Sequence, residues 1–350
     1  MNKRWGDKLS RWYMKNKRDL PWRKNQDPYK ILVSEIMLQQ TQVIKVIPYF
    51  ERFIRTFPDF ESLSQALEDD VLKLWSGLGY YRRARNLKKT SQVIVDTYNG
   101  SMPKCYEDIV KLPGIGDYTA NAILSIAFDQ SAIVLDGNVI RVSSRVFGIG
   151  RDLDKTCTKD KIKNQLKAEM FDEKPSVFNQ ALMELGALIC TPSSPHCTSC
   201  PVSQHCYALQ NHLVEELPPV KKQQEIEVQH KTAFIIKHQG KWLVTKKTNS
   251  KILNDLWIFP EVHQEKNETF EKSYGLKIKL GKKIADITHH ITYRRMRYEI
   301  REAFLKKTML SLRGQQGRGN LNLKWVSSQD LNEIPHSSLT AKIMDKVQDL

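Results

Sequence analysis

Hydrophobic positions divide the chain into two parts with different periodicities. From Trp5 to about Asn211, apolar residues recur at intervals of three and four, as in residues 120–128, and short connections containing Pro and Gly separate these runs. Such spacing is typical of amphipathic helices. We therefore predict an all-α domain over residues 1–215.

The second part alternates apolar and polar residues over short segments, which predicts strands with one buried face. The pattern covers residues 232–237, 241–245 and 298–304, and Gln239-Gly240 predicts a turn between the first two. We predict an α+β domain over residues 228–350.

A polar stretch with two prolines, residues 217–225, separates the two patterns. This composition is typical of an exposed linker, which we place at residues 216–227. A chain of 350 residues is also longer than a domain with a single hydrophobic core usually is, so the length favours two domains.

The chain carries 55 Lys and Arg against 39 Asp and Glu, a net charge of +16. This excess indicates a polyanionic partner, nucleic acid first, although a basic protein without such a partner can have the same composition. Met1–Asp7 lacks the apolar run of a signal peptide, and no segment approaches the roughly 20 apolar residues of a membrane span. We expect a soluble protein of the cytoplasm and nucleoid.

Four of the six cysteines follow the spacing C-x6-C-x2-C-x5-C, namely Cys190, Cys197, Cys200 and Cys206. Disulfides are disfavoured inside cells, and four thiolates in one loop form the ligand set of an iron–sulfur cluster or of a structural zinc ion. Zinc sites commonly have two short Cys pairs, whereas only Cys197 and Cys200 form one here, so the spacing favours a cluster. Cys105 and Cys157 stand apart and are interpreted as ordinary thiols.

The segment 112–120 places Gly114 and Gly116 in a turn directly before a helical run. Glycines at these positions let backbone N–H groups approach a phosphate at a helix N-terminus, as in a helix-hairpin-helix, which positions DNA without reading its sequence. Taken alone, Gly-x-Gly is equally compatible with a tight turn that binds nothing.

Glu35 lies in a helical stretch, residues 30–41, with Ile31, Leu32 and Leu38 as its neighbours on the same face. Apolar surroundings disfavour an ionised carboxylate and raise its pKa, which prepares Glu35 to act as a general acid near neutral pH. The alternative is a carboxylate paired with a Lys or Arg.

Asp136 follows the apolar run 132–135 and is predicted to sit at a helix N-terminus, which stabilises its anion. An N-cap Asp without a catalytic task is the alternative. Together, Glu35 and Asp136 provide one carboxyl shifted toward neutral and one held ionised. Glycosidic cleavage through an oxocarbenium-like state uses this division of roles.

These features occur with further motifs, and as a set they resemble the adenine DNA glycosylases of the MutY family, in the helix-hairpin-helix superfamily that includes endonuclease III. The motifs are LPWR at 20–23, SEIMLQQT at 34–41, GLGYYR at 77–82, the hairpin, DGN at 136–138 and the four clustered cysteines. The resemblance implies a monomer that excises adenine opposite 8-oxoguanine or guanine in double-stranded DNA and carries a [4Fe-4S] cluster on those cysteines. Glu35 would protonate the adenine ring, and Asp136 would stabilise or trap the sugar cation.

The resemblance also implies contacts to the DNA. The residues expected at the flipped adenine or its sugar are Arg23, Tyr118, Asn138 and Gln180. The residues expected at the backbone or in the vacated base stack are Gln39, Gln40, Thr41, Tyr80, Arg82, Leu112, Gly114 and Gly116. Arg83 and Arg85 are also suited to phosphates, with a solvated helix face as the alternative for all three arginines.

Tyr118 separates two related activities. In the endonuclease III branch this position, two after the second hairpin glycine, is a lysine that attacks the sugar and leads to strand cleavage. A phenol cannot form a Schiff base, so we predict a monofunctional glycosylase. An endonuclease III-like pyrimidine-damage glycosylase and lyase, and a non-catalytic DNA-binding protein, are the alternatives.

Residues 256–261 and 325–339 resemble the Nudix-like domain with which the family recognises 8-oxoguanine. The stretch 267–275 has few acidic residues for the Mg²⁺ of a working Nudix hydrolase, so we expect a domain that reads the lesion and does not hydrolyse nucleotides.

The family's lesion-contacting loop is matched here by residues 287–290. Strand alternation favours His290 as the counterpart of the family's histidine. Retention of a hydroxyl group favours Thr288 with His289 instead, and both registers remain open at this point.

Overall fold

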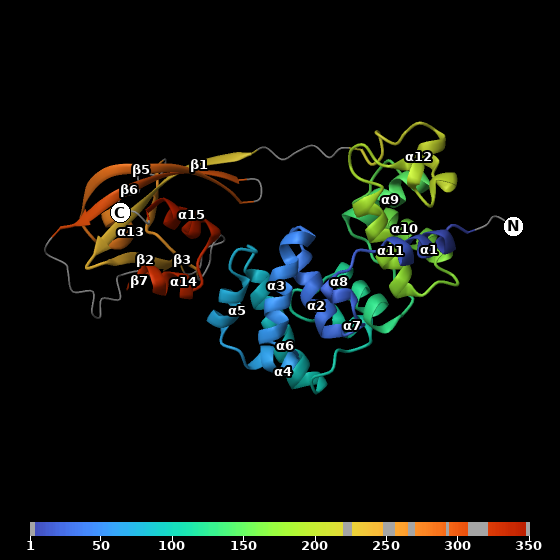
Figure 1. Cartoon of the computed structure of the whole chain (residues 1–350), viewed down its shortest axis with the longest axis horizontal. Helices are drawn as coiled ribbons and strands as arrows, with labels where there is room; N and C mark the ends of the chain where they lie inside the picture. The colour runs from blue at the N-terminus through green and yellow to red at the C-terminus, as the bar shows by residue number, and fades with distance from the viewer. Residues whose placement is uncertain are drawn as a thin grey trace. The chain divides into compact units, whose positions relative to one another are not determined.

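The computed structural model describes residues 4–219, 226–247, 256–264, 270–291, 294–306 and 321–347. The chain divides into two units, one made of Met1–Ala66 with Arg82–Lys222 and the other of Leu67–Tyr81 with Gln223–Leu350 (Figure 1). The predicted domain limits and the linker at 216–227 stay a prediction, and residues 220–225 of that linker lie outside the described residues. No helix in the described ranges has the length and apolar character needed to cross a membrane.

The first unit is all-α, as predicted. Its α-helices are α1 (Gly6–Asn16), α2 (Pro28–Leu38), α3 (Val43–Thr56), α4 (Phe60–Gln65), α6 (Arg82–Tyr98), α7 (Tyr106–Ile109), α8 (Asp117–Ala122), α9 (Gly137–Phe147), α10 (Thr156–Glu169), α11 (Pro175–Leu188) and α12 (Tyr207–Gln210). The other helical segments are the 3-10 turns η1 (Pro21–Arg23), η3 (Cys197–Ser199) and η4 (Ser203–His205), and the π-helical η2 (Ile123–Ala127).

The main core of this unit forms where α1, α9 and α11 pack together. Trp5 stacks on Phe178 with ring centroids 6.0 Å apart, and Leu182 and Val142 are buried beside them. These positions recur at helical spacing, so each helix buries one apolar stripe. This packing fixes the positions of α9 and α11, and both helices carry side chains that line the pocket described below.

α2 is buried nearly all round, from Ile31 to Met37. Its start has ordinary signals: Pro28 occupies the first turn, and the Asp27 carboxylate accepts from Tyr29 N at 2.9 Å. A helix so enclosed by protein carries any ionisable side chain into an apolar environment. Glu35 is that side chain.

The second unit contains a mixed sheet, so the α+β prediction is confirmed. Its strands are β1 (Glu227–His238), β2 (Lys241–Lys247), β3 (Trp257–Ile258), β4 (Glu261–His263), β5 (Ile278–Ile291), β6 (Arg294–Leu305) and β7 (Leu321–Val326). The order is β3-β2-β1-β6-β5, with β4 paired to β1, β7 paired to β2, and β1 parallel to β6. The predicted turn has Gln239 at φ 48° and Gly240 at φ 74°, the backbone that a tight hairpin requires.

The helices of the second unit are α5 (Glu68–Trp75), α13 (Phe270–Tyr274), α14 (Ser328–Glu333) and α15 (Ser338–Val347). α15 packs on β5 and buries Leu339 and Ile343 against Tyr298 and Ile300 of β6. The Tyr81 hydroxyl donates to the carbonyl of His336 at 2.7 Å, which ties the segment after α5 to the turn before α15.

Candidate active site

A pocket in the first unit is lined by residues from η1, α2, α8, α9 and α11. Both predicted carboxylates, Glu35 and Asp136, line it. The other predicted residues on its wall are Arg23, Gln39, Gln40, Thr41, Tyr118, Asn138 and Gln180. The structure therefore brings together side chains that are as much as 157 positions apart, from Arg23 to Gln180.

Glu35 lies in the third turn of α2 and is 6% exposed. The pKa of Glu35 is raised to about 7, first of all by burial; the hydrogen bond from Tyr118 and the charge of Arg23 oppose this rise, and the charge of Asp136 adds to it. Among the described residues, no ion pair to Glu35 is formed. Glu35 can thus hold a proton at neutral pH, as a general acid must.

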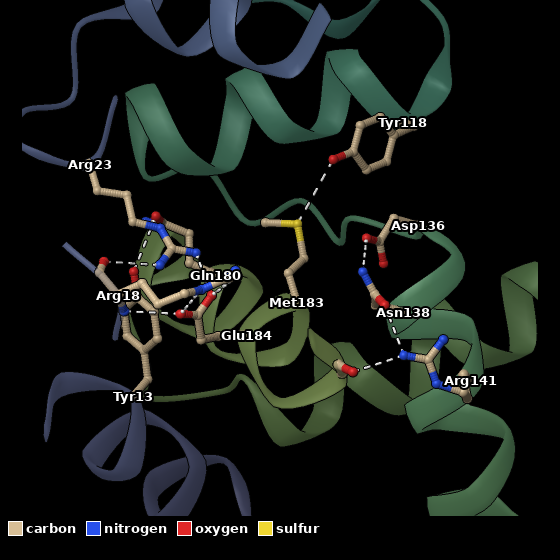
Figure 2. A network of polar contacts seen from close by, with 11 residues as sticks. Tyr13, Arg18, Arg23, Tyr118, Asp136, Asn138, Arg141, Gln180, Met183 and Glu184 are labelled. Carbon is tan, nitrogen blue, oxygen red and sulfur yellow. Dashed lines mark hydrogen bonds and ion pairs between the residues drawn. The ribbon is translucent and has the colours of Figure 1, made fainter. Parts of the chain in front are cut away.

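Tyr118 lies in α8, directly after the hairpin, and its hydroxyl donates to Glu35 Oε2 at 2.5 Å. The same hydroxyl lies 3.8 Å from the sulfur of Met183 on α11 (Figure 2). Burial raises the pKa of Tyr118 well above its usual value, so it remains a neutral donor. The resemblance predicts that Tyr118 lies near the sugar. In the structure, its hydroxyl contacts the carboxyl group of Glu35.

Asp136 caps α9, as predicted from its place before that helix. Its carboxylate accepts from Val139 N at 2.6 Å and from Asn138 Nδ2 at 3.0 Å. Burial raises the pKa of Asp136 and outweighs these donors, which lower it. The expectation that the helix terminus dominates is therefore wrong in direction, because Asp136 is more enclosed than a surface N-cap.

A buried ion network that no motif of the sequence predicts lies on the other side of the pocket. Glu184 is fully buried on α11 and accepts from Arg18 Nε and Nη2, each at 2.8 Å, and from Arg23 Nη2 at 2.8 Å. Burial raises the pKa of Glu184, but the two arginines outweigh it and bring the pKa to about 2. Arg18 and Arg23 precede Glu184 by 166 and 161 positions, so no local spacing could have revealed the network.

Figure 2 shows the two polar groups of the pocket on either side of Met183. Tyr118, Asp136 and Asn138 lie on one side. Arg23 lies on the other, together with Gln180, which accepts from the Tyr13 hydroxyl at 3.2 Å and donates to Ser176 O at 3.0 Å. The pocket thus offers a carboxyl pair on one wall and a fixed guanidinium and amide on the other.

The hairpin has the local geometry that its glycines predicted. Gly114 has φ 77°, and a Cβ there would lie 2.5 Å from the Asn86 side chain, so the fold itself requires glycine. Gly116 caps α8 with φ −109°, and a Cβ there would meet no atom within 4 Å, so the fold does not require glycine at this position. The Leu112 side chain is buried, so a contact from that position would come from its backbone.

The predicted backbone contacts differ in exposure. Arg82 is exposed at the start of α6, and Gln40 is exposed in the loop after α2. Arg83 is 9% exposed and donates to backbone carbonyls, so its interpretation as a phosphate contact is wrong. Tyr80 is 44% exposed at φ 48°, on the segment that groups with the second unit.

The four clustered cysteines line one cavity under α9 and α11. None forms a disulfide, and the cavity wall is otherwise mostly apolar, with Val142, Leu185 and Val202. Arg145, 2% exposed, donates from Nη1 to Cys190 Sγ at 3.3 Å. Among the described residues, no three His, Cys, Asp or Glu side chains are placed to hold one metal ion.

Hydrogen bonds connect the cysteine loop to the pocket along α9. Asn138 donates to Asp136 at 3.0 Å and accepts from Arg141 Nη2 at 2.8 Å. Arg141 in turn donates from Nε to Cys190 O at 2.8 Å (Figure 2 shows the first part of this chain). The loop that carries the cysteines therefore helps to orient the Asp136 partner.

In the second unit, strand alternation separates the three residues of the expected lesion-reading loop. Thr288 and His290 are exposed on one face of β5, whereas His289 is 8% exposed and faces α15. Burial, with the charges of Lys342 and His290, lowers the pKa of His289 to about 4. Thr288 and His289 therefore do not share a face. The turn residues 292–293 lie outside the described residues.

Residues 33–169 match a family described as HhH-GPD superfamily base excision DNA repair protein. Residues 232–346 match the NUDIX domain family. These matches confirm a helix-hairpin-helix glycosylase domain followed by a Nudix-like domain. Among solved structures, the chain is similar to a thermostable thymine-DNA glycosylase, with TM-score 0.54 and 29% identity over 59% of this chain and 95% of that one.

Curated relatives share more of the sequence. The adenine DNA glycosylase of Buchnera aphidicola subsp. Schizaphis graminum is 40% identical over 274 residues, which cover 78% of each chain. The adenine DNA glycosylase of Mus musculus is 46% identical over 211 residues, which cover 58% of this chain and 41% of the mouse protein. The first of these matches extends over both predicted domains.

Proposed function

Because this chain belongs to the adenine DNA glycosylases, we propose that it removes adenine mispaired with 8-oxoguanine or guanine and leaves the DNA strand uncut. It is a DNA N-glycosylase of base-excision repair, and DNA is its partner. The observation that carries the proposal is the placement of the buried Glu35, whose pKa is raised to about 7, with Asp136 in one pocket.

Base flipping is the first step. The glycosidic bond is out of reach inside a stacked duplex, and a mispaired base is easier to extrude. The adenine enters the pocket between Arg23 and Gln180 on one wall and Glu35 on the other. Gln39 and Gln40, which line the pocket, fill the space that it leaves in the stack.

Glu35 then supplies a proton. Tyr118 donates to its Oε2, so the proton of the neutral acid is on Oε1 and is delivered to a ring nitrogen of adenine. Protonation lets the base leave with the electron pair of the C1′–N9 bond. The buried network of Arg18, Arg23 and Glu184 keeps the opposite wall fixed while this occurs.

The sugar cation that remains is stabilised by the Asp136 carboxylate, and water adds at C1′ with loss of its proton. Tyr118 occupies the position at which a lyase has its lysine. The phenol of Tyr118 cannot form a Schiff base with the sugar. The product is an abasic site in an intact strand. An endonuclease III-like glycosylase and lyase would differ at this step.

We assign a [4Fe-4S] cluster to Cys190, Cys197, Cys200 and Cys206. Four thiols around one apolar cavity, with a buried arginine 3.3 Å from one sulfur, suit an anionic cluster. When bound, the cluster supplies structure and no redox step on the base. Its residues anchor Arg141 and Arg145, and through Arg141 they orient Asn138 beside Asp136.

Recognition of 8-oxoguanine is assigned to the second unit, as a reader without hydrolase activity. Within the described residues, the stretch that would carry the Nudix acids retains Glu271 on α13, and positions 267–269 lie outside those residues. The exposed Thr288 and His290 are its candidate contacts. We further propose a monomer that works with chromosomal DNA in the cytoplasm and nucleoid.

Two experiments test the proposal. Excision rates on duplexes with adenine opposite 8-oxoguanine and opposite guanine should both be measurable, with the first faster. Borohydride should not trap a covalent complex with either duplex. A robust trapped complex would instead assign the bifunctional branch, and binding without release of base would assign a non-catalytic protein.

A further inference from the structure

Arg83 lies in the first turn of α6 and is buried. Its guanidinium Nη1 donates to Ile36 O at 2.8 Å, Met37 O at 2.9 Å and Gln39 O at 2.6 Å. Its Nη2 reaches Thr41 Oγ1 at 3.3 Å. One side chain therefore contacts both the end of the helix that carries Glu35 and the loop that follows it.

The end of α2 needs such a partner. The last carbonyls of a helix find no donor inside it, and a glycine in the left-handed conformation commonly closes the end. Here the residue after Leu38 is Gln39, with φ −55° and ψ 111°. The Arg83 side chain takes the place of the missing cap, and its charge suits the negative end of the helix dipole.

The loop after α2 is held in an unusual backbone conformation. Gln40 has φ 56°, which non-glycine residues keep only when the surrounding contacts fix the chain. Arg83 bonds the carbonyl of Gln39 before it and the hydroxyl of Thr41 after it. Gln39, Gln40 and Thr41 all line the pocket that contains Glu35.

We propose that Arg83 is a positioning residue for adenine excision. By capping α2, it fixes the Glu35 carboxyl and the loop Gln39–Thr41 in one geometry before DNA arrives. It acts through these residues and does not touch the substrate. Because reacting groups tolerate little displacement, loss of the cap should reduce excision by about 10²-fold. The effect on rate rests on the proposed function; the effect on the loop does not.

Hydrogen exchange in the free protein tests the cap without reference to activity. Arg83→Met removes the hydrogen bonds to Ile36, Met37, Gln39 and Thr41, and Arg83→Lys retains the charge but not the planar fork. Leu87→Ala, one turn further along α6 at a residue that is 1% exposed, is the control because it removes a buried side chain from the same helix and leaves the Arg83 hydrogen bonds in place. We expect amides in residues 36–43 to exchange at least about tenfold faster in Arg83→Met, to be intermediate in Arg83→Lys, and to be unchanged in Leu87→Ala.

Single-turnover excision at saturating enzyme, followed across pH, tests the consequence. We expect the rate to fall in Arg83→Met and the alkaline midpoint to move to lower pH, because a frayed α2 exposes Glu35 to water. The proposal would be overturned if Arg83→Met and Leu87→Ala had the same exchange rates, excision rates and alkaline midpoints. If Arg83→Met does not fold, Arg83→Lys is compared with Leu87→Ala in its place. If the wild-type protein releases no adenine, the proposed function is rejected. The exchange measurement does not depend on activity, so it would still test whether Arg83 holds the end of α2.

Discussion

Two buried glutamates in one pocket have opposite pKa shifts because their partners differ. Glu35 has a neutral phenol as its hydrogen-bond donor, and burial raises its pKa to about 7. Glu184 accepts from two arginines that outweigh its burial and bring its pKa to about 2. At neutral pH one residue can deliver a proton, and the other is a fixed anion that holds Arg18 and Arg23.

The pH dependence of excision follows from Glu35. An acid must be protonated to act, so the single-turnover rate should fall as pH rises through about 7. Tyr118→Phe removes a hydrogen bond that lowers the pKa of Glu35, so the falling limb should move to higher pH. Tyr29→Phe on the same helix, whose hydroxyl bonds Phe57 O, is the control and should leave the limb in place. A limb that Tyr118→Phe does not move would remove Tyr118 as a partner of the acid.

Stability should depend on pH through both glutamates, with opposite signs and in different windows: from pH 4.5 to about 7 for Glu35, and from about 2 to 4.5 for Glu184. Glu35 ionises near 4.5 when unfolded and near 7 when folded, so ionisation destabilises the fold by on the order of 3 kcal/mol as pH rises between these values. Glu35→Gln should therefore be more stable than wild type at pH 8 and no more stable at pH 4. Glu184→Gln should lose stability at pH 8, since its carboxylate is stabilised when folded. Urea unfolding at both pH values measures this, and equal stability of Glu35→Gln and wild type at pH 8 would refute it.

Sequence predicted the pocket residues that belong to short motifs and missed those whose partners are distant. Glu35 and Asp136 lie beside apolar runs that reveal their local environment. Glu184 and Arg83 look ordinary in the sequence, because their roles depend on contacts 161 and 47 positions away. The direction of the Asp136 pKa shift was also out of reach, because the helix start is visible in the sequence and the depth of burial is not.

At the scale of elements, the two glycines of the hairpin differ. The fold requires glycine at position 114, and it does not require glycine at position 116. Gly114→Ala meets both a positive φ and the Asn86 side chain, so it should destabilise the protein by about 1–3 kcal/mol. Gly116→Ala meets neither, so its melting temperature should match that of wild type while duplex affinity falls by roughly tenfold, or about 1.4 kcal/mol. Thermal melts and a binding titration at fixed salt distinguish the two. Wild-type affinity in Gly116→Ala would show that no phosphate approaches this backbone.

Element types were predictable to a large extent, and element ends were less so. Periodicity indicated the helices around residues 120–128 and the strands β1, β2 and β6. It could not indicate that α2 stops at Leu38, because residues 39–41 include no proline or glycine that would end a helix, and the donor to the last carbonyls comes from Arg83. The carbonyls at the end of that helix are bonded by a residue 46 positions away in the sequence.

At the scale of the whole molecule, chemistry and lesion recognition are assigned to different units. The double substitution of Thr288 and His290 by Ala should lower the ratio of rates on 8-oxoguanine and guanine duplexes, with little change in the rate opposite guanine. Asp286→Ala, on the same exposed face of β5, is the control and should keep the ratio. An unchanged ratio in the double variant would place recognition elsewhere.

The central claim is that Glu35 drives removal of adenine without strand cleavage. It is tested most directly by base release from a duplex with one adenine opposite 8-oxoguanine, with and without alkali, using wild type and Glu35→Gln. We predict free adenine from wild type, strand breaks only after alkali, and loss of release by at least about 10²-fold in Glu35→Gln. Strand breaks without alkali, or full activity in Glu35→Gln, would contradict it.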